Sequence, residues 1–432
     1  MDTTFNTEEN AIYLPAVNAI FAEQVAKQVA DSRPFPDNLK LKDLQFWNKS
    51  NPLFYHPYVL HSIGQYKVGS VINNALTQSG RTDRVLIGDS GGFQIGKGTL
   101  NGFKDLYKGM RADDAQDAWA EAEVVRSWIL NWLETYTQYA MTIDMPLWAA
   151  TKYGTDSPFH SCSIEQLTDM TVENLKYIQQ KRTGKTQWLN VVQGNDEQTT
   201  RDWYAAVKWF KYGGWALAGE AGAAGGLLNV LKTVLMMRDD DAFSAGQDWM
   251  HVLGTSTLEW AVALTAIQKA LRKVNPKIKI SYDSSSPFQQ AGRYEEACYL
   301  PTLTKLKSSW SIPSTKSHQG HVYVGSDEKF PFSSPIADRI TLGHLNVYEG
   351  VYEKRRYDAI SNTLLTHHNV YTYLKAFDMA NEQAFGKHAD RQVPDLYLEC
   401  IDIIGQAFET SDWYGYLESK SDVLNQHSTP SF

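Results

Sequence analysis

The chain has 432 residues, 43% of them hydrophobic and 21% charged, which is an ordinary balance for one large globular domain or two smaller ones. A formal net charge of −8 excludes a chain coated in positive charge, so any contact with nucleic acid must come from a local basic patch. The three cysteines, Cys162, Cys298 and Cys400, stand far apart, which argues against a disulfide framework and against a zinc site built from cysteines.

The first 80 residues predict mixed structure. Residues 1–10 are polar and acidic, without the basic and apolar regions of a secretory signal. No apolar run reaches the length of a membrane span, so we expect a cytoplasmic protein with no membrane partner. Helical spacing extends from Ala19 to Ala30, and the stretch from Asp31 to Leu60, rich in Pro, Asn and aromatic residues, predicts loops.

A buried strand that opens into a glycine-rich loop is predicted at residues 85–94. The apolar run that starts at Val85 ends abruptly in Asp89, Ser90 and two glycines. Glycines let a backbone approach a ligand closely, and Asp89 would stand at the carboxyl end of the strand, where α/β barrels keep their chemistry. The alternative is a tight turn in which Asp89 only caps the next helix.

The rest of the first 283 residues alternates between helical and strand patterns. A helix is predicted over residues 113–139, with Trp128, Trp132 and other apolar residues on one face. Helical patterns then separate five further strands, predicted over residues 140–146, 188–194, 215–220, 251–254 and 278–283.

This alternation is typical of repeated βα units and a parallel sheet, and we predict a TIM-type (β/α)8 barrel. Polar residues gather at the carboxyl ends of the predicted strands, which favours a barrel with one active site at that face. A doubly wound open sheet is the alternative, but no GxGxxG follows an early strand. The strand-end residues are Asp89, Asp144, Gln193, Gly219 and Asp283.

The pattern breaks after Asp283. Residues 284–335 are rich in Ser, Pro, Lys and Gly and predict an insertion or loop, and residues 337–409 predict helices that close the barrel. Within that part the helical patterns cover residues 345–360, 364–385 and 397–408. We therefore expect one domain over residues 1–409 and a C-terminal tail over residues 410–432, which is polar and loose from Ser419 onward.

Three strand-end carboxylates and one amide suit a purine and its sugar. A guanine-like base presents two neighbouring donors, N1–H and an exocyclic amine, which a carboxylate can accept. Its O6 lies beside them and accepts from amide or backbone N–H donors. A further carboxylate can attack the anomeric carbon of a sugar, as in retaining glycoside chemistry.

Several motifs resemble those of the tRNA-guanine transglycosylase superfamily, in the same order along the chain. The DSGGFQ segment at Asp89–Gln94 is similar to its signature, and Tyr282-Asp283-Ser284 resembles the segment that carries its nucleophile. Further similar segments are Ile143–Pro146, Val192–Gly194, Gly214–Gly219 and Thr366–Asn369.

The resemblance implies a base exchange at a nucleoside. Asp283 would attack C1′ so that guanine leaves, and a 7-deazaguanine such as preQ0 would then displace Asp283. Asp89 would contact the base and move the proton at the displaced nitrogen. The resemblance also implies a base pocket made by Ser90, Phe93, Asp144, Gln193, Gly194 and the N–H of Gly219, and no cofactor.

The sequence departs from the tRNA-acting members in several places. It has no CxCxxC motif to accompany His368, which we interpret as a packing or capping residue at a helix start, so we predict no metal site. Ser284–Gln289 replaces the family's Pro-Thr-Arg loop, and Gly222-Ala223-Ala224 stands where a Gly-Glu would contact the 7-substituent.

These departures resemble the DNA-acting branch of the superfamily, the DpdA-type DNA 7-deazaguanine transglycosylases, and most closely the compact phage type. The implied polymer is duplex DNA from which a guanosine is flipped. A phage-encoded enzyme would act in the host cytoplasm. The alternatives are a divergent tRNA-guanine transglycosylase and a non-catalytic barrel that binds purines or nucleic acid.

Basic residues that follow the predicted barrel strands are candidates for phosphate contact. A solvated surface is the competing interpretation, but an enzyme of net negative charge needs such contacts near the flipped nucleotide. The candidates are Lys305, Lys307, Lys316, Arg355 and Arg356.

Overall fold

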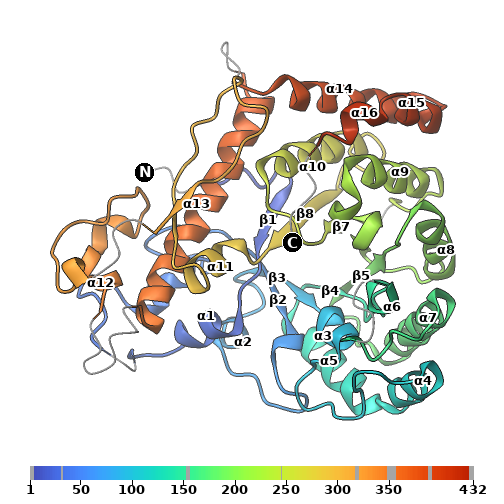
Figure 1. The fold of residues 1–432 in the computed structure, drawn as a ribbon, viewed down its shortest axis with the longest axis horizontal. Coiled ribbons are helices and arrows are strands. Elements are labelled where there is room, and N and C mark those ends of the chain that lie inside the picture. Colours follow the sequence, from blue (N-terminus) through green and yellow to red (C-terminus); the bar gives the residue numbers. More distant parts are fainter. Residues whose placement is uncertain are drawn as a thin grey trace.

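Eight parallel strands form a nearly closed barrel, which confirms the predicted TIM-type (β/α)8 fold (Figure 1). The computed structural model describes residues 4–30, 33–151, 156–244, 246–316, 321–347, 357–387 and 392–427. The strands pair in the order β1-β8-β7-β6-β5-β4-β3-β2. They are β1 Ile12–Pro15, β2 Tyr58–Ser62, β3 Val85–Asp89, β4 Tyr139–Met141, β5 Gln187–Val192, β6 Gly214–Leu217, β7 Trp249–Val252 and β8 Lys279–Ser284.

The barrel closes at two unequal seams. β1 pairs with β8 over four residues, with Leu14 opposite Asp283. Between β1 and β2 a single bridge joins Ala16 to Leu60, supported by a 2.9 Å hydrogen bond from the Val17 N–H to the Leu60 carbonyl oxygen. The seam beside the Asp283 strand is therefore the better paired of the two.

Helices follow the strands and cover the outside of the barrel (Figure 1). No helix in the described ranges is long and apolar enough to span a lipid bilayer. Around the strands lie α1 Ala19–Gln24, α2 Ala75–Gln78, α3 Gly92–Lys97, α4 Ala112–Glu121, α5 Glu123–Tyr136, α6 Trp148–Thr151, α7 Ile164–Lys181, α8 Glu197–Val207, α9 Gly226–Asp239 and α10 Leu258–Leu271. After β8 come α11 Ser286–Gly292, β9 Ala297–Cys298, β10 Ser314–Thr315, α12 Leu342–Leu345, α13 Ala359–Phe385, α14 Asp395–Glu409, α15 Trp413–Ser419 and α16 Ser421–Leu424.

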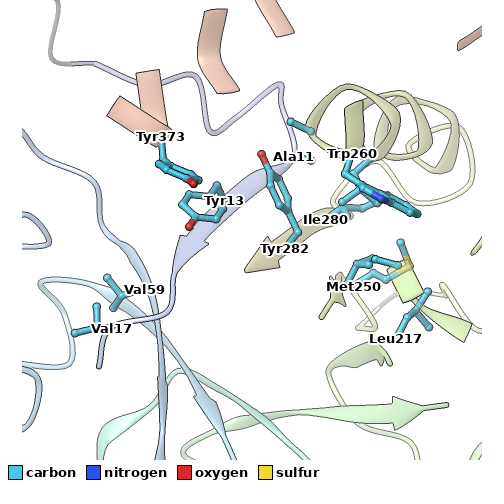
Figure 2. Close-up of a cluster of buried hydrophobic side chains, with 14 of the residues drawn as sticks. Ala11, Tyr13, Val17, Val59, Leu217, Met250, Trp260, Ile280, Tyr282 and Tyr373 are labelled. Atoms are coloured by element: carbon cyan, nitrogen blue, oxygen red, sulfur yellow. The ribbon is translucent and has the colours of Figure 1, made fainter. Parts of the chain in front are cut away.

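Alternation along the strands divides the core into an inner and an outer part, because successive side chains of a strand point to opposite faces. The small inner cluster includes Ile12, Ile87 and Val191, all of them buried. The large outer cluster lies between strands and helices; Figure 2 shows Tyr13 of β1 facing Tyr373 of α13, with ring centroids 6.2 Å apart. The long helix α13 thus covers β1.

The two strands that the sequence analysis missed are the first two of the barrel. β2 begins at Tyr58, inside the stretch predicted as loops, and β1 ends in Pro15, a residue that normally argues against a strand because it lacks an N–H donor. The helix predicted from Ala19 to Ala30 stops at Gln24. The helix predicted over residues 113–139 is two helices, α4 and α5, which meet at Ala122.

The C-terminal part is more ordered than predicted. Most of the helix predicted over residues 345–360 lies outside the described residues; in the described part, α12 ends at Leu345, and α13 begins after Asp358, whose side chain accepts a hydrogen bond from the Ser361 N–H. The segment predicted as an insertion contains the helix α11 directly after β8. Residues 413–424 form α15 and α16 instead of a loose tail, because apolar side chains such as Leu417 are fully buried there.

Leu417 provides a test of the packed C-terminal helices. Leu417→Ala removes a side chain with no exposed surface, so we expect the free energy of unfolding to fall by about 2–4 kcal/mol. The same substitution at Leu306, which is 89% exposed, should change it by less than about 0.5 kcal/mol. Urea unfolding of both variants measures the difference; equal effects at the two positions would show that the C-terminal helices do not pack in solution.

Candidate active site

Three carboxylates lie together at the carboxyl ends of the barrel strands, and we call Asp89, Asp144 and Asp283 the acidic mouth. Asp89 is the last residue of β3, Asp283 is the next-to-last residue of β8, and Asp144 follows β4 by three residues. All three are partly buried. Their charges interact, since Asp283 raises the pKa of Asp89, and Asp89 raises that of Asp144. The structure thus brings the three predicted acids to one face.

Asp89 is held by the turn that follows it. Its Oδ1 accepts a 3.2 Å hydrogen bond from the N–H of Gly91, whose φ of +85° lies in the left-handed region that glycine tolerates. Burial raises the pKa of Asp89, hydrogen bonds from Ser62 and Gly91 lower it, and Asp283 raises it further; the net shift is upward. Asp89 therefore binds a proton more readily than a carboxyl group in water.

Gly92 lets the start of α3 approach Asp144. A Cβ placed on Gly92 would lie 3.1 Å from Asp144 Oδ1, tighter than ordinary van der Waals contact. Ser90 beside it is fully buried, and its hydroxyl donates to the Thr142 carbonyl oxygen at 3.1 Å. Ser90 therefore joins the segments after β3 and β4, which fixes the distance between two of the acids.

The side-chain amide of Gln193 forms its hydrogen bonds within the protein. Its Nε2 donates to Asp144 Oδ2 at 2.9 Å and to the Met145 carbonyl oxygen at 3.1 Å. Its Oε1 accepts from the Leu147 N–H at 3.0 Å. In this arrangement Gln193 orients Asp144, a function that the sequence analysis did not assign to it.

The pKa of Asp144 is strongly raised. Burial and then the neighbouring Asp89 raise the pKa of Asp144 to about 7, against the hydrogen bond from Gln193, which lowers it. The protein thus holds a carboxyl group that changes charge near neutral pH.

Asp283 has one restrained and one open oxygen. Its Oδ1 accepts hydrogen bonds from the Gly254 N–H at 3.0 Å and from His251 Nε2 at 3.2 Å. No residue in the described ranges donates to Oδ2. Sequence reasoning missed His251, because its position opposite Ser281 and in phase with Asp283 follows from the pairing of β7 with β8.

The remaining predicted base-pocket residues lie at neighbouring strand ends. The Gly194 carbonyl oxygen accepts from the Glu220 N–H at 3.0 Å, which joins the ends of β5 and β6, and Gly219 between them is exposed. Phe93 on α3 is 50% exposed, and its ring centroid lies 5.4 Å from that of Trp148 on α6. The pair follows Asp89 and Asp144 closely in the chain, which makes Trp148 a second aromatic candidate for base stacking.

The described lysines among the predicted phosphate contacts lie after the last barrel strand, in and beside the segment that joins β9 to β10. Lys305 and Lys307 are exposed in the segment between β9 and β10, and Lys316 is exposed just after β10. Within the described residues, none of these lysines forms an ion pair. Arg355 and Arg356 lie outside the described residues.

The histidine with a resemblance to a zinc ligand is a packing residue. His368 lies inside α13, not at a helix start as predicted, and is fully buried. Its Nδ1 is 2.8 Å from Ser334 Oγ and its Nε2 2.7 Å from the Cys298 carbonyl oxygen. Over the ranges that the structure describes, no three His, Cys, Asp or Glu side chains are placed to hold a metal ion.

No protein-family model matches the chain, and neither does any curated protein. Fold and geometry define a (β/α)8 barrel whose strand ends carry three interacting carboxylates; one of these, Asp283, has one oxygen within hydrogen-bond distance of a buried histidine and one open oxygen.

Asp144→Asn tests the raised pKa through stability. Between pH 4 and 7 the folded protein binds more protons at Asp144 than the unfolded chain does, so this residue lowers stability as pH rises, and the loss is complete above pH 7. The side chain at position 144 of the variant cannot ionise, so the free energy of unfolding of the variant relative to the wild type should increase from pH 4 to 7 and then level off. Chemical unfolding at several pH values measures this; Asp169→Asn on the exposed side of α7 is the control, and a flat difference for Asp144→Asn would contradict the shift.

Proposed function

We propose that the protein is a pentosyltransferase that replaces guanine in DNA by a 7-deazaguanine such as preQ0, through a covalent bond between Asp283 and the sugar. The observation that carries the proposal is the open Oδ2 of Asp283 at the end of β8, in electrostatic contact with a second acid of raised pKa. A nucleophilic carboxylate and a proton carrier are the two groups that such an exchange requires.

In the first half of the exchange, Asp283 Oδ2 bonds to C1′ as the bond from C1′ to N9 of guanine breaks. The electron pair of that bond goes to guanine, which takes a proton from Asp89. The upward-shifted pKa of Asp89 suits this step, because it keeps a proton available at higher pH than an ordinary aspartic acid does.

In the second half, the incoming 7-deazaguanine loses the proton at N9 to Asp89 and attacks C1′ from the side that guanine left. The bond from C1′ to Asp283 breaks, and its electron pair returns to the carboxylate. Both groups are restored, so one carboxylate and one proton carrier are sufficient and no cofactor enters the balance. The sugar keeps its original configuration because it is inverted twice.

Asp144 is the group that would recognise the base. An ionised carboxylate accepts from N1–H and from the exocyclic amine of guanine, and 7-deazaguanine presents the same edge. The hydrogen bond from Gln193 fixes the orientation of this carboxylate before a base arrives. Phe93 and Trp148 supply aromatic faces for stacking on a planar base. The same pocket thus accepts the leaving and the entering base.

DNA is favoured over tRNA by what surrounds the nucleophile strand. The segment after Asp283 forms α11 and begins Ser-Ser-Ser-Pro, so the arginine-bearing loop of the tRNA-acting enzymes is not there. A flipped nucleotide needs a base pocket, a nucleophile below C1′ and basic contacts to the flanking phosphates. Lys305, Lys307 and Lys316, exposed and without ion pairs among the described residues, are our candidates for those contacts.

Asp283→Asn tests the nucleophile. The amide keeps the size of the side chain but removes the nucleophilic carboxylate, so exchange of labelled guanine in DNA should fall by at least about 10³-fold. Intact-mass measurement should show a protein–DNA adduct for the wild type and none for the variant. Wild-type exchange by a folded Asp283→Asn protein would instead favour a barrel that binds purines without this chemistry.

The choice of polymer is tested by offering purified enzyme and preQ0 with either duplex DNA or tRNA. We expect incorporation into DNA, and weaker DNA binding as salt rises, because phosphate contacts release counterions. Charge reversal at Lys305 and Lys307 should weaken DNA binding and leave the affinity for free base unchanged, with Lys181→Glu on α7 as the control. Incorporation into tRNA alone would identify a divergent tRNA-guanine transglycosylase.

A further inference from the structure

A chain of hydrogen bonds runs inside the barrel and ends at Asp283. Trp249 Nε1 lies 2.7 Å from Ser281 Oγ, Ser281 Oγ lies 2.8 Å from His251 Nδ1, and His251 Nε2 lies 3.2 Å from Asp283 Oδ1. The chain alternates between β7 and β8, where Trp249 is 4% exposed and both His251 and Ser281 are fully buried.

The donor at one end of this series of hydrogen bonds determines which atom donates at each step. An indole N–H only donates, so Ser281 Oγ accepts from Trp249 and its single hydrogen is available for His251 Nδ1. A neutral imidazole that accepts at Nδ1 carries its hydrogen on Nε2, which then donates to Asp283. Every polar atom of the buried chain is satisfied in this tautomer, and no second charge is needed.

The two oxygens of Asp283 are therefore unequal. Oδ1 is restrained by His251 from below and by the Gly254 N–H, and Oδ2 has no donor among the described residues. An oxygen that already accepts two hydrogen bonds is a poorer nucleophile than its free neighbour. The restrained oxygen also fixes the rotation of the carboxylate, and hence the direction in which Oδ2 points.

We propose that His251 is a positioning residue that directs Oδ2 at C1′ and stabilises Asp283 when the carboxylate leaves the sugar; this role rests on the proposed function. In the covalent intermediate Oδ1 is an ester carbonyl oxygen with little charge. As the bond from Oδ2 to C1′ breaks, negative charge returns to both oxygens, and fixed N–H donors bind the charged form more strongly than the ester. His251 accordingly assists the second half of the exchange more than the first.

The variants His251→Leu and His251→Gln separate donation from packing. Leucine fills the space without a donor, so we expect the second half to slow by about 10²-fold and the adduct to accumulate, with the first half slowed less than about tenfold. Glutamine retains an N–H donor and should restore most of the wild-type ratio of the two rates. His61→Leu removes another fully buried strand histidine and should leave that ratio unchanged.

The measurements are guanine release, adduct lifetime by rapid quench and intact mass, and the tautomer of His251 by imidazole ¹⁵N NMR. Equal slowing of both halves by His251→Leu, or an Nδ1–H tautomer in the wild type, would overturn the proposed role of His251 alone. Wild-type protein that exchanges no base and forms no adduct would overturn the proposed function and this role with it. The two failures are thus distinguishable.

Discussion

Parallel pairing in a closed ring is the constraint on which the site depends. Because all eight strands run in one direction, every carboxyl end meets at a single face, and the register places Ser62 beside Asp89 and Leu14 beside Asp283. Residues nearly 200 positions apart in the chain therefore interact electrostatically. A one-residue slip in β8 would turn Asp283 to the outer face and bring Tyr282 inside.

The acidic mouth gathers like charges in partly buried positions, which opposes folding. The upward pKa shifts of Asp89 and Asp144 are the measure of that opposition, because they show that the folded protein resists ionising both. The surrounding structure offsets it with hydrogen bonds of 2.9–3.2 Å: from Gly91 to Asp89, from Gln193 to Asp144, and from Gly254 and His251 to Asp283. Each of the three carboxylates accepts from a different hydrogen-bond donor.

Strong local signals in the sequence predicted the barrel and its acids, and weak ones failed. Six strands are largely apolar runs separated by helical patterns, and those were found. β1 is only four residues long and ends in a proline, and β2 lies at the end of a stretch rich in Pro, Asn and aromatic residues, so neither shows the alternation. The partners of the acids could not be predicted in the same way, because the hydrogen bonds of Gln193 and His251 depend on which strands become neighbours. The sequence of the C-terminal helices α15 and α16 is mostly polar and predicted a loose tail, because only a few residues, such as Leu417, pack inward.

The pairing of β1 with β8 also determines when the protein can fold. A ribosome makes β1 first, but its well-paired neighbour β8 appears only after residue 279, and the covering helix α13 after residue 359. At about 5–20 residues per second, the nascent strand waits on the order of 10–50 s for β8. Contacts between such distant segments make closure a slow, late event. The ring is therefore completed after synthesis of most of the chain, and a stalled or truncated product carries an open barrel with an apolar edge.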